Sequence, residues 1–284
     1  MSNTASHQAD RTPAGNRQEG DIEGGLSLGG DRVQLRIEEG VAEVRLVRAE
    51  KHNGLDLAML EALNEALDVV VADPEARVVV LFGEGKSFCS GLDLKSVFSD
   101  FDAATAQITQ RREGEAENWA QRAIHGWRSS PLPVIAALQG ACFGAGFQLA
   151  LAADVRIAAP NTQISALEIQ YGLIPDLGLS QTLHGLVRDD VARELVYSGR
   201  VVEAEEAERL GLITSISENP RGAARMLANE IAAKSPEAIR AAKWLLGEGP
   251  KLPVAGGLAL EEELQGQLLV SLGRLAALSE PAGS

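Results

Sequence analysis

The sequence is poor in cysteine and histidine, and this scarcity limits the chemistry that it can perform. Only two cysteines, Cys89 and Cys142, occur among 284 residues, which is too few for a disulfide framework. We read both as small buried side chains and not as nucleophiles. The four histidines lack the spacing that is typical of metal ligands, so we predict no metal site and assign no histidine a catalytic role.

Basic residues are also scarce, since 26 lysines and arginines stand against 40 aspartates and glutamates, which leaves a net charge of −14. An acidic chain is a poor partner for nucleic acid or an anionic membrane, so we predict neither partner. Long apolar runs are missing as well, because polar residues such as Gln139, Gln148 and Asp154 interrupt the most apolar part of the chain. The first residues lack the apolar segment of a secretion signal, and we expect a cytoplasmic protein.

The remaining composition, 45% hydrophobic and 23% charged, predicts one α/β domain with a substantial core. Residues 1–30 are polar and glycine-rich, and we predict a disordered tail there. We place the core at 31–225 and a helical region at 226–284, where Ser235-Pro236 is a typical helix start. Periodicity and turn residues predict a hairpin over 33–46, a helix after Asp56, and helices over 189–197 and 203–210. The polar stretch 102–128 has a helical composition. Short strands are predicted at 155–158 and 163–165.

Two continuous apolar runs, 78–82 and 134–138, have the length and β-branched content of buried parallel strands. Each run ends in a glycine-bearing loop, and the second loop leads through Gly144 into an apolar helix. The carboxyl ends of parallel strands meet at one edge of a sheet, so each loop is placed to supply a backbone amide to the same ligand oxygen. The alternative is that the glycines serve only the tight packing of an ordinary strand-to-helix turn.

The segments SFCSGLDL (87–94) and GACFGAGFQLALAADVRIAA (140–159) resemble the two signature segments of the crotonase (enoyl-CoA hydratase/isomerase) superfamily. Three further segments resemble the family in the expected order, at 48–55, 165–178 and 197–213, so the likeness covers roughly 31–246. The resemblance implies a spiral of repeated ββα units with C-terminal helices that assemble homotrimers or hexamers. It implies an acyl-CoA thioester substrate, with coenzyme A as part of that substrate and no further cofactor.

The resemblance assigns the two loops to the thioester carbonyl. The backbone amides of Leu92 and Ala145 would bind its oxygen and stabilise the enolate that forms when a neighbouring proton leaves. Gly91 and Gly144 would give the backbone the freedom to present these amides, and both are expected to lie at the substrate together with Asp93.

The resemblance also implies where coenzyme A binds. Arg48 and Lys51 would meet its phosphates, and Ser87 would lie near its pantetheine arm; the alternative is that the two basic residues are ordinary solvated charges. The chain departs from the family at its end, because residues 271–284 lack the usual basic and aromatic pattern of the last helix. We therefore expect coenzyme affinity or assembly to differ from the family pattern.

The acidic residues decide the reaction. The resemblance implies that hydratases of the family use two glutamates. The second corresponds to Glu168 here, but the first corresponds to Gln148. A glutamine cannot exchange protons near pH 7, and we expect Gln148 to contact the substrate. A second acid, Asp176, lies eight residues after Glu168 (176 − 168), an arrangement similar to that of dienoyl-CoA isomerases. Alternatively, Glu168 is only a helix-start residue and Asp176 only caps a helix that starts near Leu177.

We predict an enzyme that shifts double bonds in enoyl- or dienoyl-CoA thioesters, with Glu168 as the main proton shuttle and Asp176 as its partner. One rival is an enoyl-CoA hydratase that uses Glu168 alone. Another rival is a crotonase homologue that binds acyl-CoA without chemistry. A hydrolase is disfavoured, because the chain has no Gly-x-Ser-x-Gly elbow.

Overall fold

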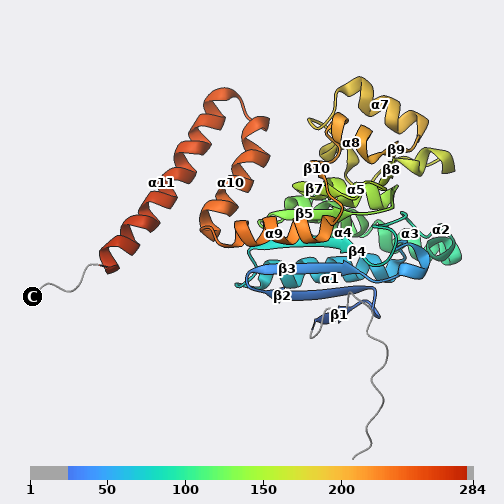
Figure 1. Cartoon of the computed structure of the whole chain (residues 1–284), viewed down its shortest axis with the longest axis horizontal. Coiled ribbons are helices and arrows are strands. Elements are labelled where there is room, and N and C mark those ends of the chain that lie inside the picture. The colour runs from blue at the N-terminus through green and yellow to red at the C-terminus, as the bar shows by residue number, and fades with distance from the viewer. Residues whose placement is uncertain (1–24, 280–284) are drawn as a thin grey trace, which may run out of the picture.

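A seven-stranded sheet forms the centre of the computed structural model, which describes residues 25–279 and, at 100, 101 and 273–279, the backbone alone (Figure 1). The strand order is β1-β2-β3-β4-β5-β7-β10, and a smaller sheet has the order β6-β8-β9. The strands are β1 (Leu26–Leu28), β2 (Val33–Glu38), β3 (Val41–Leu46), β4 (Val78–Gly83), β5 (Val134–Leu138), β6 (Ala141–Phe143), β7 (Val155–Ala158), β8 (Gln163–Ser165), β9 (Val202–Glu203) and β10 (Ser215–Ile216).

The helices lie on both faces of the large sheet and beyond its edge (Figure 1). They are α1 (Leu57–Ala72), α2 (Leu94–Val97), α3 (Phe101–Ile108), α4 (Trp119–Ser129), α5 (Ala145–Ala152), α6 (Leu179–Thr182), α7 (Asp189–Ser198), α8 (Ala204–Leu210), α9 (Pro220–Ala232), α10 (Pro236–Glu248) and α11 (Val254–Ser279). This mixture of strands and helices, with helices at the C-terminal end, confirms the predicted α/β class.

The predicted hairpin over 33–46 is confirmed. β2 and β3 pair antiparallel through a two-residue turn in which Glu39 and Gly40 both have positive φ, 52° and 81°. Such a turn matches the right-handed twist of the strands. The prediction for the N-terminal tail is wrong at its end, because Leu26–Leu28 forms β1 and pairs antiparallel with β2. Residues 1–24 of that predicted tail lie outside the described part of the chain.

The parallel strands are covered on both faces, which explains why they read as continuous apolar runs. Along β4, Val79 and Leu81 pack into the core on the α1 and α4 side, whereas Val78 and Val80 pack against α9. Ala224, Ala228 and Ala232 of α9 belong to that second cluster. The predicted boundary at 225/226 falls within α9, the helix that covers this face of the sheet, and the division into a core and a C-terminal region stays a prediction.

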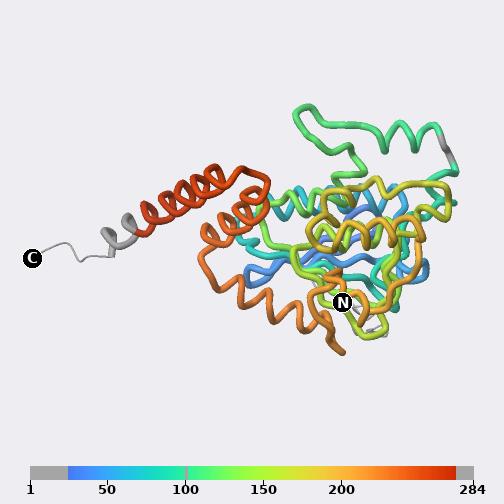
Figure 2. The backbone as a smooth tube through the Cα atoms, turned by 90° about the horizontal axis from the view of Figure 1, so that it is seen from above, coloured from blue at the N-terminus to red at the C-terminus, as the bar shows by residue number. Residues whose placement is uncertain are grey.

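Helix α1 begins as predicted, because the Asp56 side chain accepts a hydrogen bond from the Met59 amide at 2.8 Å. Near the end of this helix Val70 is buried, while Val71 is 46% exposed. The polar stretch 102–128 holds α3 and α4, and Ile124 and Trp127 of α4 are fully buried. Figure 2 shows α3 and its link to α4 standing away from the sheet.

The last two helices project from the body of the molecule (Figure 1). Ser235 caps α10 as predicted, with its Oγ 3.3 Å from the Ala238 amide. Although α10 carries apolar residues at helical spacing, Ala242 and Leu246 are exposed, and Leu246 reaches 75%. Lys243 holds α10 to the sheet instead, donating to the Leu132 carbonyl and pairing with Asp154. Within residues 25–279, no helix combines the length and apolarity that a membrane span requires.

Candidate functional site

The loops that follow β4 and β5 meet, as predicted from the parallel order of these strands. The Cys89 amide donates to the Ala141 carbonyl at 3.1 Å, and the Phe143 amide donates to the Cys89 carbonyl at 3.0 Å. Cys89 and Cys142 are both buried and free, and burial raises the pKa of the Cys89 thiol to about 12 and that of Cys142 well above its usual value. Both are protonated at neutral pH, so their predicted role as buried side chains is confirmed.

The Leu92 and Ala145 amides point out of their loops. Leu55 pairs with the backbone on both sides of Leu92, accepting from the Asp93 amide at 2.9 Å and donating to the Gly91 carbonyl at 2.8 Å. The amide of Leu92 itself is therefore on the opposite side of the strand. Ala145 opens α5, where an amide has no acceptor within its own helix. Among the described residues, neither amide has a backbone acceptor.

Two glycines bring these amides close to a carboxyl group. Gly91 has φ +95°, and a Cβ added there would lie 2.9 Å from the Phe143 carbonyl oxygen and 3.6 Å from the Ala145 nitrogen. Gly144 has φ +51°, and a Cβ added there would lie 3.4 Å from Oε1 of Glu168. The first loop, the start of α5 and Glu168 thus lie within contact distance of one another.

The Glu168 carboxyl is held at one oxygen only. Its Oε1 accepts a hydrogen bond from Gln148 Nε2 at 2.7 Å, and Gln148 Oε1 in turn accepts from the Leu177 amide at 2.8 Å. Oε2 of Glu168 is buried and has no hydrogen-bond partner among the described residues. Gln148 is 2% exposed, so the direct substrate contact predicted for it requires one of its two hydrogen bonds to break. In this structure Gln148 orients Glu168.

Both acids have a raised pKa. Burial raises the pKa of Glu168, the negative charge of Asp176 raises it further, and hydrogen bonds from its own amide and from Gln148 oppose this. Burial likewise raises the pKa of Asp176. Carboxyl groups whose pKa is raised by burial are candidates for proton transfer.

Within the described chain, the structure shows no helix-capping contact from the side chain of either acid. Helix α6 starts after Gly178, and no side chain caps it, so Asp176 is not its capping residue. Glu168 does lie in the first turn of a 3-10 helix, Leu167–Tyr171, but its carboxyl bonds to Gln148. Neither acid is explained by helix capping.

Arg48 organises the loop beside the site. It is 9% exposed, and its guanidinium donates to the Gly54 carbonyl at 2.8 Å and to Asp93 at 2.9 Å. Burial opposes ionisation of Asp93, but hydrogen bonds from Arg48 and the Ser96 amide prevail and lower its pKa. Because the Arg48 charge is already paired, the structure favours a positioning role, and the contact with coenzyme phosphate stays a prediction.

Ser87 and Lys51 differ in how accessible they are. Ser87 is buried, and its Oγ lies 3.0 Å from His52 Nδ1 and 3.4 Å from the Ala141 amide, which donates to it. Lys51 is exposed, and its charge contributes to the lowered pKa of Asp93. Lys51 is therefore the predicted coenzyme residue whose charge is most accessible, while the coenzyme contacts of both residues stay predictions.

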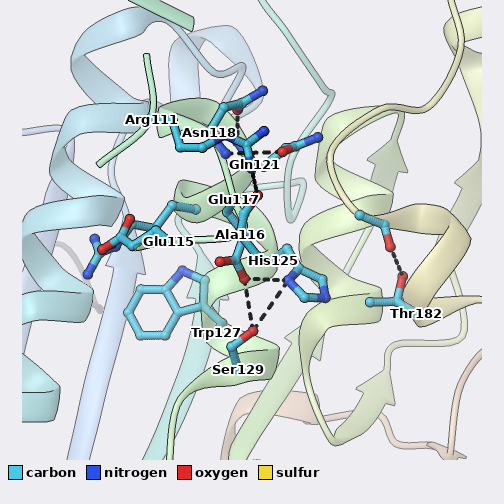
Figure 3. Close-up of polar contacts among 12 residues, drawn as sticks. Arg111, Glu115, Ala116, Glu117, Asn118, Gln121, His125, Trp127, Ser129 and Thr182 are labelled. Carbon is cyan, nitrogen blue, oxygen red and sulfur yellow. Dashed lines mark hydrogen bonds and ion pairs between the residues drawn. The ribbon is translucent and has the colours of Figure 1, made fainter. Parts of the chain in front are cut away.

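A histidine that the sequence analysis left without a role lines a cavity together with Asp176. His125 on α4 is paired through Nδ1 with Glu117 Oε1 at 2.8 Å, and Ser129 Oγ donates to the same oxygen at 3.0 Å (Figure 3). His125 and Asp176 line one cavity of about 400 Å³ between α4 and the segment 175–181. The spacing of His125 and Ser129, one helical turn apart, was the only sequence signal of this cluster.

Comparison with known proteins gives a consistent result. A model of the enoyl-CoA hydratase/isomerase family matches residues 36–272. The chain is 31% identical to a mitochondrial methylglutaconyl-CoA hydratase of Mus musculus, over 87% of this chain and 80% of the relative, and 33% identical to an (E)-benzylidenesuccinyl-CoA hydratase of Thauera aromatica, over 83% and 90%. The structure resembles an enoyl-CoA hydratase from Bacillus anthracis, with a TM-score of 0.77 and 30% identity over 87% of this chain and 94% of the other. It also resembles a Thermobifida fusca protein solved in complex with CoA, with a TM-score of 0.75 and 29% identity over 86% and 95%.

Proposed function

We propose that this chain, which belongs to the enoyl-CoA hydratase/isomerase family, shifts double bonds in enoyl- or dienoyl-CoA thioesters. The observation that carries the proposal is the state of Glu168. It is a carboxyl with one oxygen held by Gln148 and the other buried without a partner, beside two outward-facing amides. The Glu168 carboxyl can therefore transfer a proton next to two backbone amides that can bind a developing oxyanion.

In this proposal, Glu168 Oε2 removes a proton from the carbon next to the thioester carbonyl of a 3-enoyl-CoA. The electron pair moves onto the carbonyl oxygen, where the amides of Leu92 and Ala145 stabilise the resulting dienolate. The same carboxyl then returns the proton to the fourth carbon, and the double bond has moved into conjugation with the carbonyl. In a 3,5-dienoyl-CoA the proton returns farther along the chain, and Asp176 is the acid on that side.

The absence of a second carboxyl at Gln148 disfavours hydration. Adding water needs one group to activate the water and another to protonate the substrate, whereas an amide does neither near pH 7. Gln148 is also occupied at both ends by Glu168 and Leu177. Isomerisation needs only one group that takes and returns a proton.

Hydration is nevertheless the second candidate, because the relatives named above are hydratases. Turnover of purified protein on 3-enoyl-, 3,5-dienoyl- and 2-enoyl-CoA separates the candidates. We expect the first two substrates to isomerise. Loss of the conjugated absorbance of 2-enoyl-CoA as the only reaction would establish a hydratase, and tight binding with no turnover of any substrate would establish a binding protein.

The pH profile of isomerisation should depend on Asp176. Glu168 must be ionised to accept a proton, so kcat/KM for a 3-enoyl-CoA should fall as the pH drops through its raised pKa. Asp176→Asn removes a negative charge that raises this pKa, so the acidic limb should move to lower pH. The exposed Asp190→Asn is the control and should leave the profile unchanged. An acidic limb that does not move in Asp176→Asn would contradict the coupling of the two acids.

A carboxyl group at position 148 should increase the rate of hydration. Gln148→Glu places a second carboxyl beside Glu168, and we expect hydration of 2-enoyl-CoA to rise by about tenfold or more. Gln148→Leu is the matched control, because it also removes the amide but adds no acid. A rate that stays at the level of this control would show that the second carboxyl is not what hydration lacks.

A further inference from the structure

The cavity beside Asp176 has a polar wall. It lies between α4 and the segment 175–181 and measures about 400 Å³, within the usual range of ligand pockets of roughly 300–1,000 Å³. Six of the nine described residues that line it are charged or polar, namely Glu117, Gln121, His125, Asp176, Ser180 and Gln181. A hydrocarbon chain in the cavity would displace the water that hydrogen-bonds to these groups and would offer no hydrogen bonds in return. The loss of those hydrogen bonds costs free energy.

His125 is held in one orientation on this wall. Glu117 Oε1 accepts from both His125 Nδ1 and Ser129 Oγ, at 2.8 and 3.0 Å. Burial raises the pKa of Glu117, but the hydrogen bonds from His125 and Ser129 outweigh it and lower that pKa, so Glu117 is a carboxylate at neutral pH. A carboxylate only accepts, so Nδ1 of His125 must carry the proton that it shares.

This pairing leaves the second ring nitrogen for a ligand. Figure 3 shows Nε2 of His125 pointing away from Glu117, toward the side on which Thr182 lies. Within the described residues it has no protein hydrogen-bond partner. With Nδ1 protonated, Nε2 accepts a hydroxyl proton in the neutral ring and donates to a carbonyl in the charged ring.

Asp176 connects the cavity with the proposed reaction centre. It lines the cavity, and its charge acts on Glu168. Gln121 of α4 donates to the Asp176 carbonyl at 3.0 Å and ties the two walls together. Under the proposed function, an acyl chain that passes Asp176 enters the cavity that His125 also lines.

We propose that the acyl group of the substrate carries a neutral oxygen function, a hydroxyl or a carbonyl, that His125 recognises. This inference rests on the proposed acyl-CoA function. A neutral group fits better than a carboxylate, because two carboxyl groups, Glu117 and Asp176, line the cavity and no lysine or arginine is among its described lining residues.

Binding of unreactive saturated thioesters tests the inference apart from turnover. Calorimetry would compare hexanoyl-CoA, 6-hydroxyhexanoyl-CoA and hexanedioyl-CoA, which differ only at the far end of the chain. We expect the hydroxylated thioester to bind about tenfold tighter than the other two. His125→Phe should abolish this preference, and Glu117→Gln should weaken it, while the exposed His184→Phe should leave it intact.

The binding results that would contradict the inference can be told apart from those that would contradict the acyl-CoA function. Equal binding of the hydroxylated and plain thioesters, or tighter binding of the carboxylated one, overturns the inference and leaves the acyl-CoA function standing. A preference that survives in His125→Phe also overturns it. Failure of all three thioesters to bind removes the acyl-CoA function itself, and the inference falls with it.

Discussion

Glu168→Gln should lower kcat for isomerisation of a 3-enoyl-CoA by roughly 10²- to 10⁴-fold, the usual contribution of a positioned general acid–base group. The substituted side chain keeps an oxygen that can accept the hydrogen bond from Gln148, so the geometry around it is preserved. What is lost is Oε2, the carboxyl oxygen that has no protein partner in the described chain. The measurement is kcat from initial rates, with thioester affinity measured in parallel.

The affinity for a saturated acyl-CoA should change little in this variant, because the carboxyl acts on the proton and not on the coenzyme. Glu205→Gln, on the exposed side of α8, provides the matched control and should retain full activity. Residual isomerisation within a factor of a few of the unmodified protein would remove Glu168 from the mechanism. Asp176 would then be the acid to test next.

Gly91→Ala should lower kcat by roughly 10²- to 10³-fold, comparable to the loss of one oxyanion donor. Gly91 has φ +95°, and the new Cβ would lie 2.9 Å from the Phe143 carbonyl oxygen, so the loop must move. That movement displaces the Leu92 amide from the Ala145 amide. The enolate should lose stabilisation, while binding of the coenzyme portion persists, so kcat falls more than affinity.

Gly114→Ala separates this effect from the cost of the backbone conformation alone. Gly114 has φ +82°, yet a Cβ added there meets no atom within 4 Å. The control should lose about 1 kcal/mol of folding free energy without losing activity. Thermal unfolding and kcat measured on both variants give the comparison. Equal kcat in Gly91→Ala and the unmodified protein would argue against Leu92 as a donor to the substrate.

Much of the fold is predictable from the sequence because its signals are local. Alternation and the Glu39-Gly40 turn predict the hairpin of β2 and β3, and Asp56 and Ser235 predict where α1 and α10 begin. Whether the apolar face of a helix is buried depends on distant parts of the structure and is harder to predict from the sequence. α10 has the apolar spacing of a packed helix, yet Leu246 is 75% exposed, because nothing in the chain as described covers that face.

In the candidate site, too, some features could be predicted from the sequence and others could not. The two glycine loops could be proposed from the sequence, since adjacent parallel strands must end at one edge of the sheet, whereas the two acids were proposed from the resemblance to the family. The partners of Gln148 and Arg48 could not be identified. Gln148 reaches a carboxyl 20 residues away, and Arg48 pairs with an aspartate 45 residues away.

The sequence by itself therefore determined the fold class, the order of the elements and the residue types at the site. Only the tertiary structure decided that Glu168 keeps one oxygen without a partner, that Arg48 is already paired, and that His125 stands with Glu117 beside Asp176. The physical reason is distance along the chain. Periodicity and capping act within a few residues, whereas a hydrogen bond between distant segments depends on where packing places both backbones and which rotamers the packing allows.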